Sequence, residues 1–264
     1  MQYFFKITPL CVLPLLITVG AVCAQTTDTN APSIGKINFS LGLIQTNNTL
    51  VKGVTIQSKT GLLLDANYEK GPWVASMQNG LGFKLINGKT FSLGLSANYM
   101  PGRYVANDTR YAGMGDVTGT LSAYSWAQWK PFKDALTVYG NVAHSARSSS
   151  GILANAGTTL GFPVMGKLNG FVDVNLTWGS AAYNQSYYGV SSVQSGSSLY
   201  AIYNAPGGRI STTPSVGLVY EADKQWSIVG YLGKNLLAPA AANSPMATNK
   251  TSQPQAALLS TWSY

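Results

Sequence analysis

The chain has 264 residues and a formal net charge of +8, yet only 10% of its residues are charged. Typical soluble domains carry about 25% charged residues, so this composition argues against a soluble globular protein. Beyond the first 24 residues the sequence contains no run of about 18 or more apolar residues, which argues against a helical membrane protein. Abundant glycine (28), tyrosine (15) and tryptophan (6) favour an all-β transmembrane barrel.

Residues 1–24 are expected to be a secretory signal peptide, in which an apolar run ends at the cleavage pattern Val22-Cys23-Ala24. Lipid attachment at Cys23 is the alternative, which Val22 disfavours because a small residue normally precedes an acylated cysteine. Both cysteines, Cys11 and Cys23, lie in this segment, so the mature chain is expected to have no disulfide and no thiolate metal site. A short periplasmic segment, 25–34, would then precede a barrel over 35–264.

Alternating patterns and turn residues predict an antiparallel up-and-down barrel of twelve strands. These strands lie near 35–45, 49–57, 60–68, 72–86, 90–100, 117–130, 135–147, 151–162, 167–180, 209–221, 225–236 and 253–264. An even count places both termini in the periplasm and the three long connections, 101–116, 181–208 and 237–252, on the outer side. The segment 49–57 is poorly patterned, so a ten-strand barrel is the alternative.

The last strand ends on an aromatic residue, as the closing strand of a bacterial outer-membrane barrel does. Counting back by twos from the end gives a largely apolar face of Tyr264, Trp262, Ser260, Leu258 and Ala256. Trp262 and Tyr264 are therefore interpreted as the assembly signal of the barrel. Tryptophans are also expected in girdles at the two membrane interfaces: Trp73 and Trp178 at the outer ends of strands, and Trp129, Trp226 and Trp262 near inner ends.

Several motifs in the expected outer loops occur in a fixed order. They are Tyr99-Met100-Pro101-Gly102-Arg103, Gly113-Met114-Gly115-Asp116, Tyr187-Tyr188-Gly189-Val190, the pair Tyr203 and Gly208, and Ser244-Pro245 after an alanine run. In this order they resemble the MipA/OmpV family of outer-membrane proteins, named for a protein that binds a lytic murein transglycosylase. The resemblance implies a scaffold that docks a lytic transglycosylase and a murein polymerase to the outer membrane. A structural explanation of the motifs is that they fold the outer loops over or into the barrel mouth.

Enzyme signatures are sparse, and the chain is expected not to be an enzyme and to need no cofactor or metal. The only histidine, His144, falls on the face of its strand that carries Val138 and Val142, and the adjacent Ser145 points to the opposite face. A serine–histidine pair for hydrolysis is thus not predicted. The carboxylates are scattered, and the basic residues form no cluster suited to nucleic acid.

The turn assignment places lysines at or near the inner rim. They are Lys59, Lys89, Lys130, Lys133, Lys167 and Lys224, of which Lys89, Lys133, Lys167 and Lys224 are the candidate docking rim. Such a rim would attract acidic surfaces of periplasmic enzymes or carboxylates of murein peptides, although lysines also commonly serve only to solubilise turns.

The barrel pattern predicts a location in the bacterial outer membrane, and the family resemblance implies a scaffold there. Its other expected partners are outer-membrane lipid, lipopolysaccharide and the outer-membrane assembly machinery. A small-solute channel or a surface adhesin is the alternative function, because about twelve strands lies between packed barrels and open pores.

Overall fold

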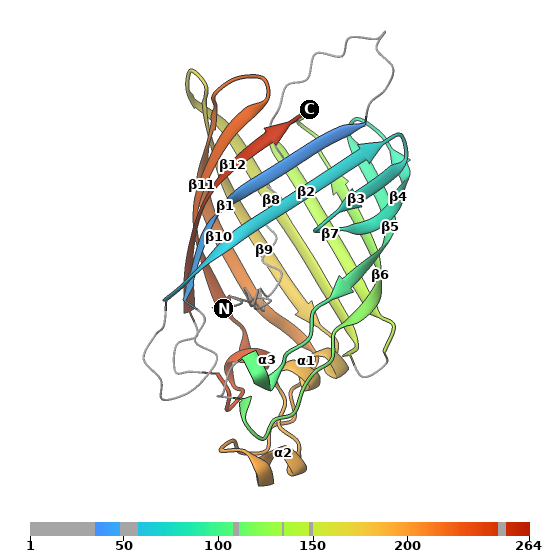
Figure 1. Cartoon of the computed structure of the whole chain (residues 1–264), viewed down its shortest axis with the longest axis vertical. Coiled ribbons are helices and arrows are strands. Elements are labelled where there is room, and N and C mark those ends of the chain that lie inside the picture. The colour runs from blue at the N-terminus through green and yellow to red at the C-terminus, as the bar shows by residue number, and fades with distance from the viewer. Residues whose placement is uncertain (1–34, 48–57, 108–110, 134, 148–149, 248–251) are drawn as a thin grey trace, which may run out of the picture.

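A computed structural model describes residues 35–47, 58–107, 111–133, 135–147, 150–247 and 252–264. These residues form twelve antiparallel strands that close into one barrel (Figure 1), which confirms the predicted class and strand count. The strands are β1 (Lys36–Asn47), β2 (Ser58–Lys70), β3 (Trp73–Ser76), β4 (Gly80–Asn87), β5 (Phe91–Met100), β6 (Thr120–Trp129), β7 (Leu136–Ser145), β8 (Ile152–Met165), β9 (Leu168–Gly179), β10 (Gly208–Glu221), β11 (Trp226–Leu237) and β12 (Ser252–Ser263). The helical elements are η1 (Val105–Asn107), α1 (Ala181–Tyr188), α2 (Ser192–Ser197) and α3 (Pro239–Ala242).

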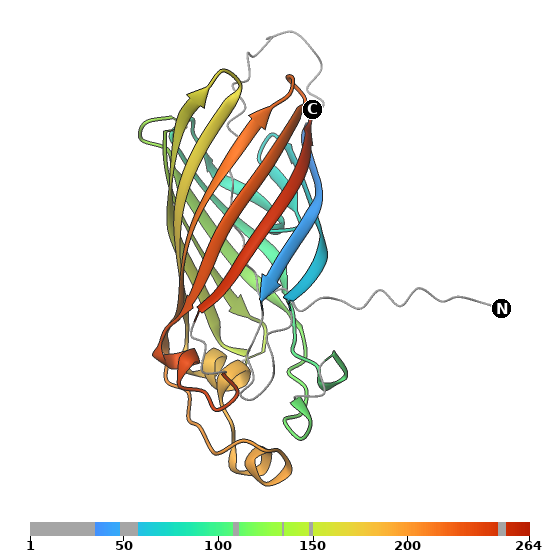
Figure 2. The same ribbon diagram turned by 90° about the vertical axis from the view of Figure 1, so that its left-hand side faces the viewer.

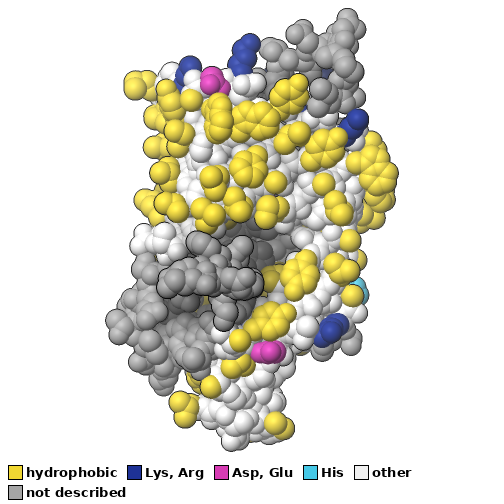
Figure 3. All heavy atoms as spheres, in the orientation of Figure 1, with side chains coloured by type: hydrophobic (Ala, Val, Ile, Leu, Met, Phe, Trp, Pro, Cys, Tyr) yellow, Lys and Arg dark blue, Asp and Glu magenta, His cyan; other side chains and the backbone are white. Residues whose placement is uncertain are grey.

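The outer surface of the barrel wall is apolar because every second side chain of a strand points outward. On β1, for example, Phe39, Leu41 and Leu43 are exposed at 44%, 45% and 56%. Figure 3 shows such hydrophobic side chains spread over the wall that faces the viewer. A contiguous apolar belt of this kind matches a hydrocarbon environment. Among the described residues, no helix is long and apolar enough to span a membrane.

The inward face of the wall carries polar networks beside a packed apolar cluster. Asn155 donates to Asn141 over 3.0 Å and accepts a hydrogen bond from Thr177 over 2.8 Å. Asp173 accepts hydrogen bonds from Tyr139 and Thr159 at 3.1 and 2.7 Å. The apolar cluster comprises Ile44, Phe171, Val219, Val229, Tyr231 and Ala257. Polar and apolar side chains therefore both line the inner wall at these strands.

The two ends of the barrel differ in the length of their connections (Figure 2). Short links, such as 88–90, 166–167 and 222–225, lie at the end where the C-terminus lies, and the three α-helices lie at the opposite end. All three long connections predicted from the sequence belong to the helical end, as expected. Since outer-membrane barrels have short periplasmic turns and long extracellular loops, we refer to the two ends as the periplasmic mouth and the outer cap.

The closing seam joins β1 to β12, in register from Asn38↔Ser263 to Thr46↔Gln255. At its periplasmic end the backbone N–H of Tyr264 donates to the carbonyl of Ile37 over 2.8 Å, and the reverse hydrogen bond spans 3.0 Å. The apolar face predicted for the last strand points outward, because Gln255, Ala257, Thr261 and Ser263 are buried on the other face. No edge is left at this seam, where an unpaired backbone in lipid would be costly.

The N-terminal third differs from the sequence prediction in two respects. β1 pairs directly with β2, from Lys36↔Glu69 to Asn47↔Ser58, so no strand separates them in the sheet. The strand expected at 49–57 lies outside the described residues. The single strand expected at 72–86 is instead two strands, β3 and β4, around a tight turn at 77–79.

The turn between β3 and β4 has a local cause. Gly80 has a φ of +77°, and a Cβ on this residue would lie 2.0 Å from the carbonyl oxygen of Ala97. The hydroxyl of Ser76 accepts hydrogen bonds from the backbone N–H groups of Gln78 and Asn79, at 3.1 and 3.2 Å. The pair Asn79-Gly80 is a recognised hairpin signal, and it marks the turn that the alternation pattern hid.

This turn changes the direction of β2, which runs toward the periplasmic mouth rather than away from it. Lys59 pairs with Thr46 at the outer end of β2, so its placement on the inner rim was wrong. Trp73 pairs with Lys70 near the periplasmic mouth, not at an outer strand end. Trp129, Trp226 and Trp262 lie near the periplasmic strand ends, as predicted.

Candidate functional site

The periplasmic mouth carries the four lysines of the candidate docking rim, each in a different turn. Lys89 lies in the β4–β5 turn, Lys133 in the β6–β7 turn, Lys167 between β8 and β9, and Lys224 between β10 and β11. All four are exposed. The ammonium of Lys167 donates to the carbonyl of Ala222 over 2.6 Å, which ties two neighbouring turns together. The barrel thus brings cations from across the sequence to one rim.

Four further lysines belong to the same end of the barrel: Lys36, Lys70, Lys84 and Lys130. The acidic residues described there are fewer: Glu69, Glu221 and Asp223. The sequence analysis passed over three of these lysines. Lys36 and Lys84 lie within strands rather than in turns, and Lys70 follows a strand that was expected to run in the opposite direction. The alternation of Gly80, Gly82 and Lys84 on one face of β4 was the signal that Lys84 points inward.

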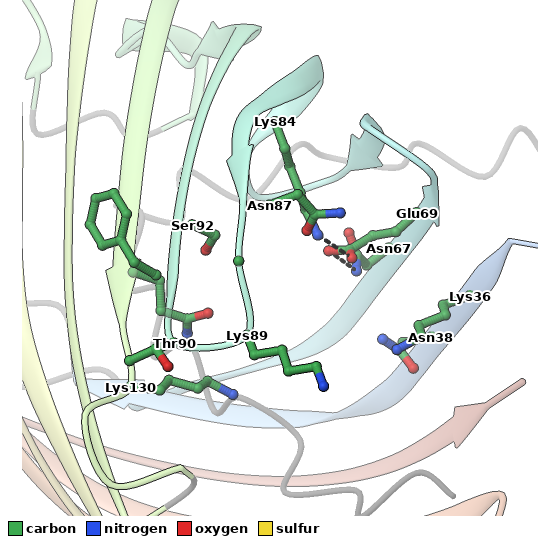
Figure 4. A pocket seen from close by; sticks show the side chains of 13 residues that line it. Lys36, Asn38, Asn67, Glu69, Lys84, Asn87, Lys89, Thr90, Ser92 and Lys130 are labelled. Atoms are coloured by element: carbon green, nitrogen blue, oxygen red, sulfur yellow. Dashed lines mark hydrogen bonds and ion pairs between the residues drawn. The ribbon is translucent and has the colours of Figure 1, made fainter. Parts of the chain in front are cut away.

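A polar pocket of about 370 Å³ opens at this mouth, between the start of β1 and the β4–β5 turn (Figure 4). Its charged lining consists of Lys36, Lys84, Lys89, Lys130 and Glu69. Side-chain amides and hydroxyls complete most of the lining: Asn38, Asn67, Asn87, Gln128, Thr90 and Ser92. The sequence did not reveal this pocket, because its walls come from five strands, β1, β2, β4, β5 and β6, whose direction and register were not all predicted.

One cation of the pocket is already paired. The ammonium of Lys84 lies 2.5 Å from Oε2 of Glu69, and Figure 4 shows Lys84 directed toward that carboxylate. The amide of Asn67 donates to the other carboxylate oxygen, Oε1, over 3.5 Å. Glu69 is the only acidic residue that lines the pocket among the described residues.

A carboxylate at the same mouth is held in its charged form. The backbone N–H groups of Gln225 and Trp226 each donate to Asp223 over 2.8 Å. These hydrogen bonds lower the pKa of Asp223 below its usual value, and nearby Lys167 acts in the same direction. The interaction stabilises the β10–β11 turn that presents Lys224.

The outer cap brings together the loop motifs that are far apart in the sequence. Arg103, buried at 6% exposure, donates from Nη1 to the carbonyl of Tyr187 over 3.1 Å. The same Nη1 lies 3.5 Å from the sulfur of Met246, and the guanidinium lies 5.0 Å from the ring centre of Tyr111. Arg103 thereby contacts all three long connections, which supports a structural role for this motif.

Other motif residues make similar contacts within the cap. The hydroxyl of Ser244, next to Pro245, donates to the carbonyl of Tyr188 over 2.6 Å. Asp116 accepts a hydrogen bond from the backbone of Val105 over 2.7 Å. Gly102 is buried, with its Cα so close to the next segment that a Cβ would lie 2.1 Å from the carbonyl oxygen of Val117.

Helix α1 packs against the inner wall at the outer cap. Tyr183 and Tyr188 pack in one apolar cluster with the inward-facing wall residues Met100, Tyr124 and Ile210. Gly189 ends the helix, and its N–H donates to the carbonyl of Gln185 over 3.0 Å. Burial raises the pKa of Tyr183 and of Tyr188 well above the usual value, and neighbouring tyrosines add to both shifts. Both phenols stay neutral, so they pack rather than act as bases.

The remaining sequence candidates lie apart from both sites. Trp262 and Tyr264 stack at the periplasmic end of the seam, with ring centres 6.0 Å apart. His144 is exposed on the outer face of β7, whereas Ser145 is buried on the other face. Within the described part of the chain, no group of three or more His, Cys, Asp or Glu side chains is placed to hold a metal ion.

Comparison with solved structures finds weak likenesses among barrel proteins. OmpF of Salmonella typhi, solved in complex with daunomycin, is 12% identical, covers 78% of this chain and 62% of its own, and gives a TM-score of 0.39. The outer membrane channel DcaP of Acinetobacter baumannii is 9% identical over 87% of this chain and 96% of its own, with a TM-score of 0.37. The toluene transporter TodX of Pseudomonas putida is 9% identical over 88% and 90%, with a TM-score of 0.36.

No curated protein matches the chain. A family model does: the one described as MltA-interacting protein MipA matches residues 42–264, which is nearly the whole described barrel. This match confirms the family that the loop motifs indicated and extends it to the N-terminal strands. The chain is a bacterial outer-membrane β-barrel protein and belongs to the MltA-interacting protein MipA family.

Proposed function

We propose that this protein is a non-enzymatic anchor that docks murein-remodelling enzymes to the periplasmic side of the outer membrane. The partners are a lytic transglycosylase and a murein polymerase, in keeping with the description of the family as MltA-interacting. The observation that carries the proposal is the positive charge of the periplasmic mouth. Among the described residues at this end, eight are lysines and only three are acidic.

A cationic rim of this kind suits docking for two physical reasons. A surface of one sign attracts partners with acidic patches and speeds their encounter. Each exposed ion pair contributes only about 0.2–1 kcal/mol, so several lysines must act together to hold a partner. Lys89, Lys133, Lys167 and Lys224 lie in four turns around the mouth and satisfy that requirement.

The test is capture of a purified lytic transglycosylase by the detergent-solubilised barrel. Replacing Lys89, Lys133, Lys167 and Lys224 together by Gln is expected to weaken capture roughly tenfold at low salt and to flatten its salt dependence. Heat-modifiable migration on gels should remain, since these residues lie in solvent-exposed turns. Arg147→Gln with Lys234→Gln, two exposed cations outside the rim, is the control. Equal capture by the quadruple variant across a salt series would disprove docking by this rim.

A small-solute channel is the alternative function, and the polar networks on the inner wall favour it. The packed contact of α1 with Met100, Tyr124 and Ile210 at the outer cap opposes it. A surface adhesin would use the cap loops instead. Planar-bilayer recordings separate a channel from an anchor. A steady conductance of the barrel alone, without the partner enzyme, would favour a channel.

The proposal includes the route to the membrane. We take residues 1–24 as a cleaved signal peptide, 25–34 as a short periplasmic segment and 35–264 as the barrel, with insertion by the outer-membrane assembly machinery. The apolar belt would then contact lipid and lipopolysaccharide. Amino-terminal sequencing of the protein from outer membranes should begin at Gln25, and a start at Met1 would refute the cleavage.

A further inference from the structure

Lys234 lies on the lipid-facing surface of the barrel wall, where cations are rare. Its neighbour along β11, Asn235, is buried on the inner face and accepts a hydrogen bond from Thr213 over 3.1 Å. Since side chains alternate along a strand, Lys234 points outward, and it is exposed between the exposed Leu232 and Leu236. A charge on this face is unfavourable unless an anion or the membrane interface compensates it.

The described part of the wall offers Lys234 no anion. In the sheet Lys234 lies beside Pro254 on β12 and Pro214 on β10, and neither side chain carries a polar group. The described acidic residues of the strands β9 to β12 are Asp173, which is buried on the inner face, and Glu221, at the periplasmic end. A compensating anion on the outer surface would therefore have to come from the membrane.

The height of Lys234 on the wall matches the outer membrane interface. Trp226 begins β11 at the periplasmic end, and Lys234 follows it along the same strand. At about 3.4 Å per residue and a strand tilt of about 40°, their separation corresponds to roughly 20 Å along the barrel axis. The apolar band of such barrels is about 25 Å tall, so Lys234 lies near its outer edge. From there its ammonium can extend to the lipid head groups.

A second outward cation lies on the adjoining strand, β10. Arg209 pairs with Trp178 of β9, and Trp178 faces outward because the next residue, Thr177, donates a hydrogen bond to Asn155 on the inner face. Arg209 is exposed and lies nearer the outer cap than Lys234 does. Figure 2 shows that β10 and β11 run side by side to the helical end. The two cations can thus approach one head group from above and below.

Phosphate is the anion that fits this pair at a lipid interface. The ammonium of Lys234 attracts it as a point charge, and the planar guanidinium of Arg209 can bind two of its oxygens at once. Apolar side chains beside the cations, Leu232 and Leu236, would contact the acyl chains of the same lipid. Trp178 lies where an amphipathic ring borders the head groups.

We propose that the outward surface at the outer ends of β10 and β11 binds the phosphates of lipopolysaccharide through Lys234 and Arg209. A defined site of this kind goes beyond general contact of the apolar belt with lipid. It rests on the membrane orientation used in the proposed function, with the outer cap toward the outer leaflet. It does not rest on enzyme docking, because the lysine rim lies at the opposite end of the barrel.

The test is native mass spectrometry of the detergent-solubilised barrel titrated with purified lipids, without any enzyme. The probes are lipid A, which is the phosphorylated anchor of lipopolysaccharide, lipid A from which both phosphates have been removed, and phosphatidylglycerol. Lipid A should bind about tenfold more tightly than either other probe. Equal binding of the phosphate-free form would overturn the proposal. Equal binding of phosphatidylglycerol would assign the site to phospholipid and overturn the choice of lipopolysaccharide.

Two double variants with equal loss of charge locate the binding. Arg209→Gln with Lys234→Gln should weaken the binding of lipid A about tenfold. Lys36→Gln with Lys70→Gln removes two exposed cations at the periplasmic mouth and should have little effect. Equal weakening by both double variants would show diffuse attraction and refute a site at β10 and β11.

A single variant separates lipid binding from a structural role of Lys234. Lys234→Met removes the charge from the lipid-facing wall, so without lipid A the variant should unfold at the same temperature as the parent or higher. Lipid A should raise the unfolding temperature of the parent, because a ligand of the folded state stabilises it. The variant should lose at least half of that rise.

Two results of this experiment would contradict the proposal. One is a variant that keeps the full rise with lipid A, since Lys234 would then not bind the lipid. The other is a variant that unfolds at a lower temperature without lipid A, which would assign Lys234 a structural role. Because no enzyme is present, lipid binding can fail while enzyme capture succeeds, and the reverse also holds.

Discussion

The two ends of the barrel use cationic residues in opposite ways. At the outer cap, Arg103 is buried and its guanidinium contacts Tyr187, Met246 and the ring of Tyr111. At the periplasmic mouth, the lysines of the turns stay exposed, and Lys84 forms an ion pair with Glu69. The buried cation contacts three connections of its own chain and so stabilises the cap, whereas the exposed lysines of the turns are the basis of the proposed docking.

The largest expected effect is on assembly at the periplasmic end. Tyr264→Asp should sharply reduce insertion into the outer membrane, because the terminal aromatic stacks on Trp262 and contributes roughly 1.5–3 kcal/mol of apolar burial at the interface. Heat-modifiable migration and yield in outer-membrane fractions measure it. Tyr264→Phe, which keeps the ring, is the control. Unchanged migration and yield for the Asp variant would count against a role of the last residue in barrel closure.

The next largest expected effect is a loss of stability in the outer cap that leaves the barrel wall intact. Arg103→Ala should destabilise the cap by about 2–4 kcal/mol, since it removes a buried hydrogen bond and a cation–π contact. Limited proteolysis of the loops 101–119 and 180–207 should become faster while the barrel stays heat-modifiable. Arg147→Ala, at an exposed position, should leave the cleavage rate unchanged. If the cap loops of the Arg103→Ala variant resist proteolysis as well as those of the parent protein, the structural role of Arg103 is refuted.

Two glycines in one cap loop test how closely the loops of the cap pack against each other. Gly113 and Gly115 have φ of +80° and +69°, so alanine strains the backbone at either position. A Cβ at Gly113 would lie 1.8 Å from the carbonyl oxygen of Ser197, whereas nothing lies within 4 Å of one at Gly115. Gly113→Ala should therefore destabilise the contact with α2 by about 1–3 kcal/mol more than Gly115→Ala. Cleavage rates near α2 compare the two, and equal rates would argue against close packing there.

The smallest effect concerns the β10–β11 turn. Because hydrogen bonds lower the pKa of Asp223, its charged form stabilises the fold above the usual value of 3.8, and this contribution is lost as pH falls through the lowered pKa. Asp223→Asn should be slightly less stable than the parent at neutral pH, and the difference should vanish in acid. Urea midpoints at several pH values measure it. A difference that persists unchanged in strong acid would exclude this charge effect.

Local pattern was enough to predict the barrel and its closing strand. A strand in lipid must alternate, so Leu258 and Trp262 could be placed outward from the sequence, as could His144 on β7. Periodicity failed at 72–86, because the pattern continues across Asn79-Gly80 while the chain reverses there. Because of this extra turn, β2 runs in the direction opposite to the predicted one, and Lys59 lies at the outer end of the barrel.

The sequence by itself determined the fold class, the family and the lysines of the turns, since each depends on neighbouring residues along the chain. Only the tertiary structure decided which distant residues meet. Arg103 reaches Tyr187 and Met246 because three long connections meet at the outer cap. Lys36 and Lys89 line one pocket because β1 and the β4–β5 turn reach the same end of the sheet. Contacts of this kind depend on the direction and the register of the strands around the barrel. The alternation of side chains along the sequence does not determine the direction or the register of strands that long connections join.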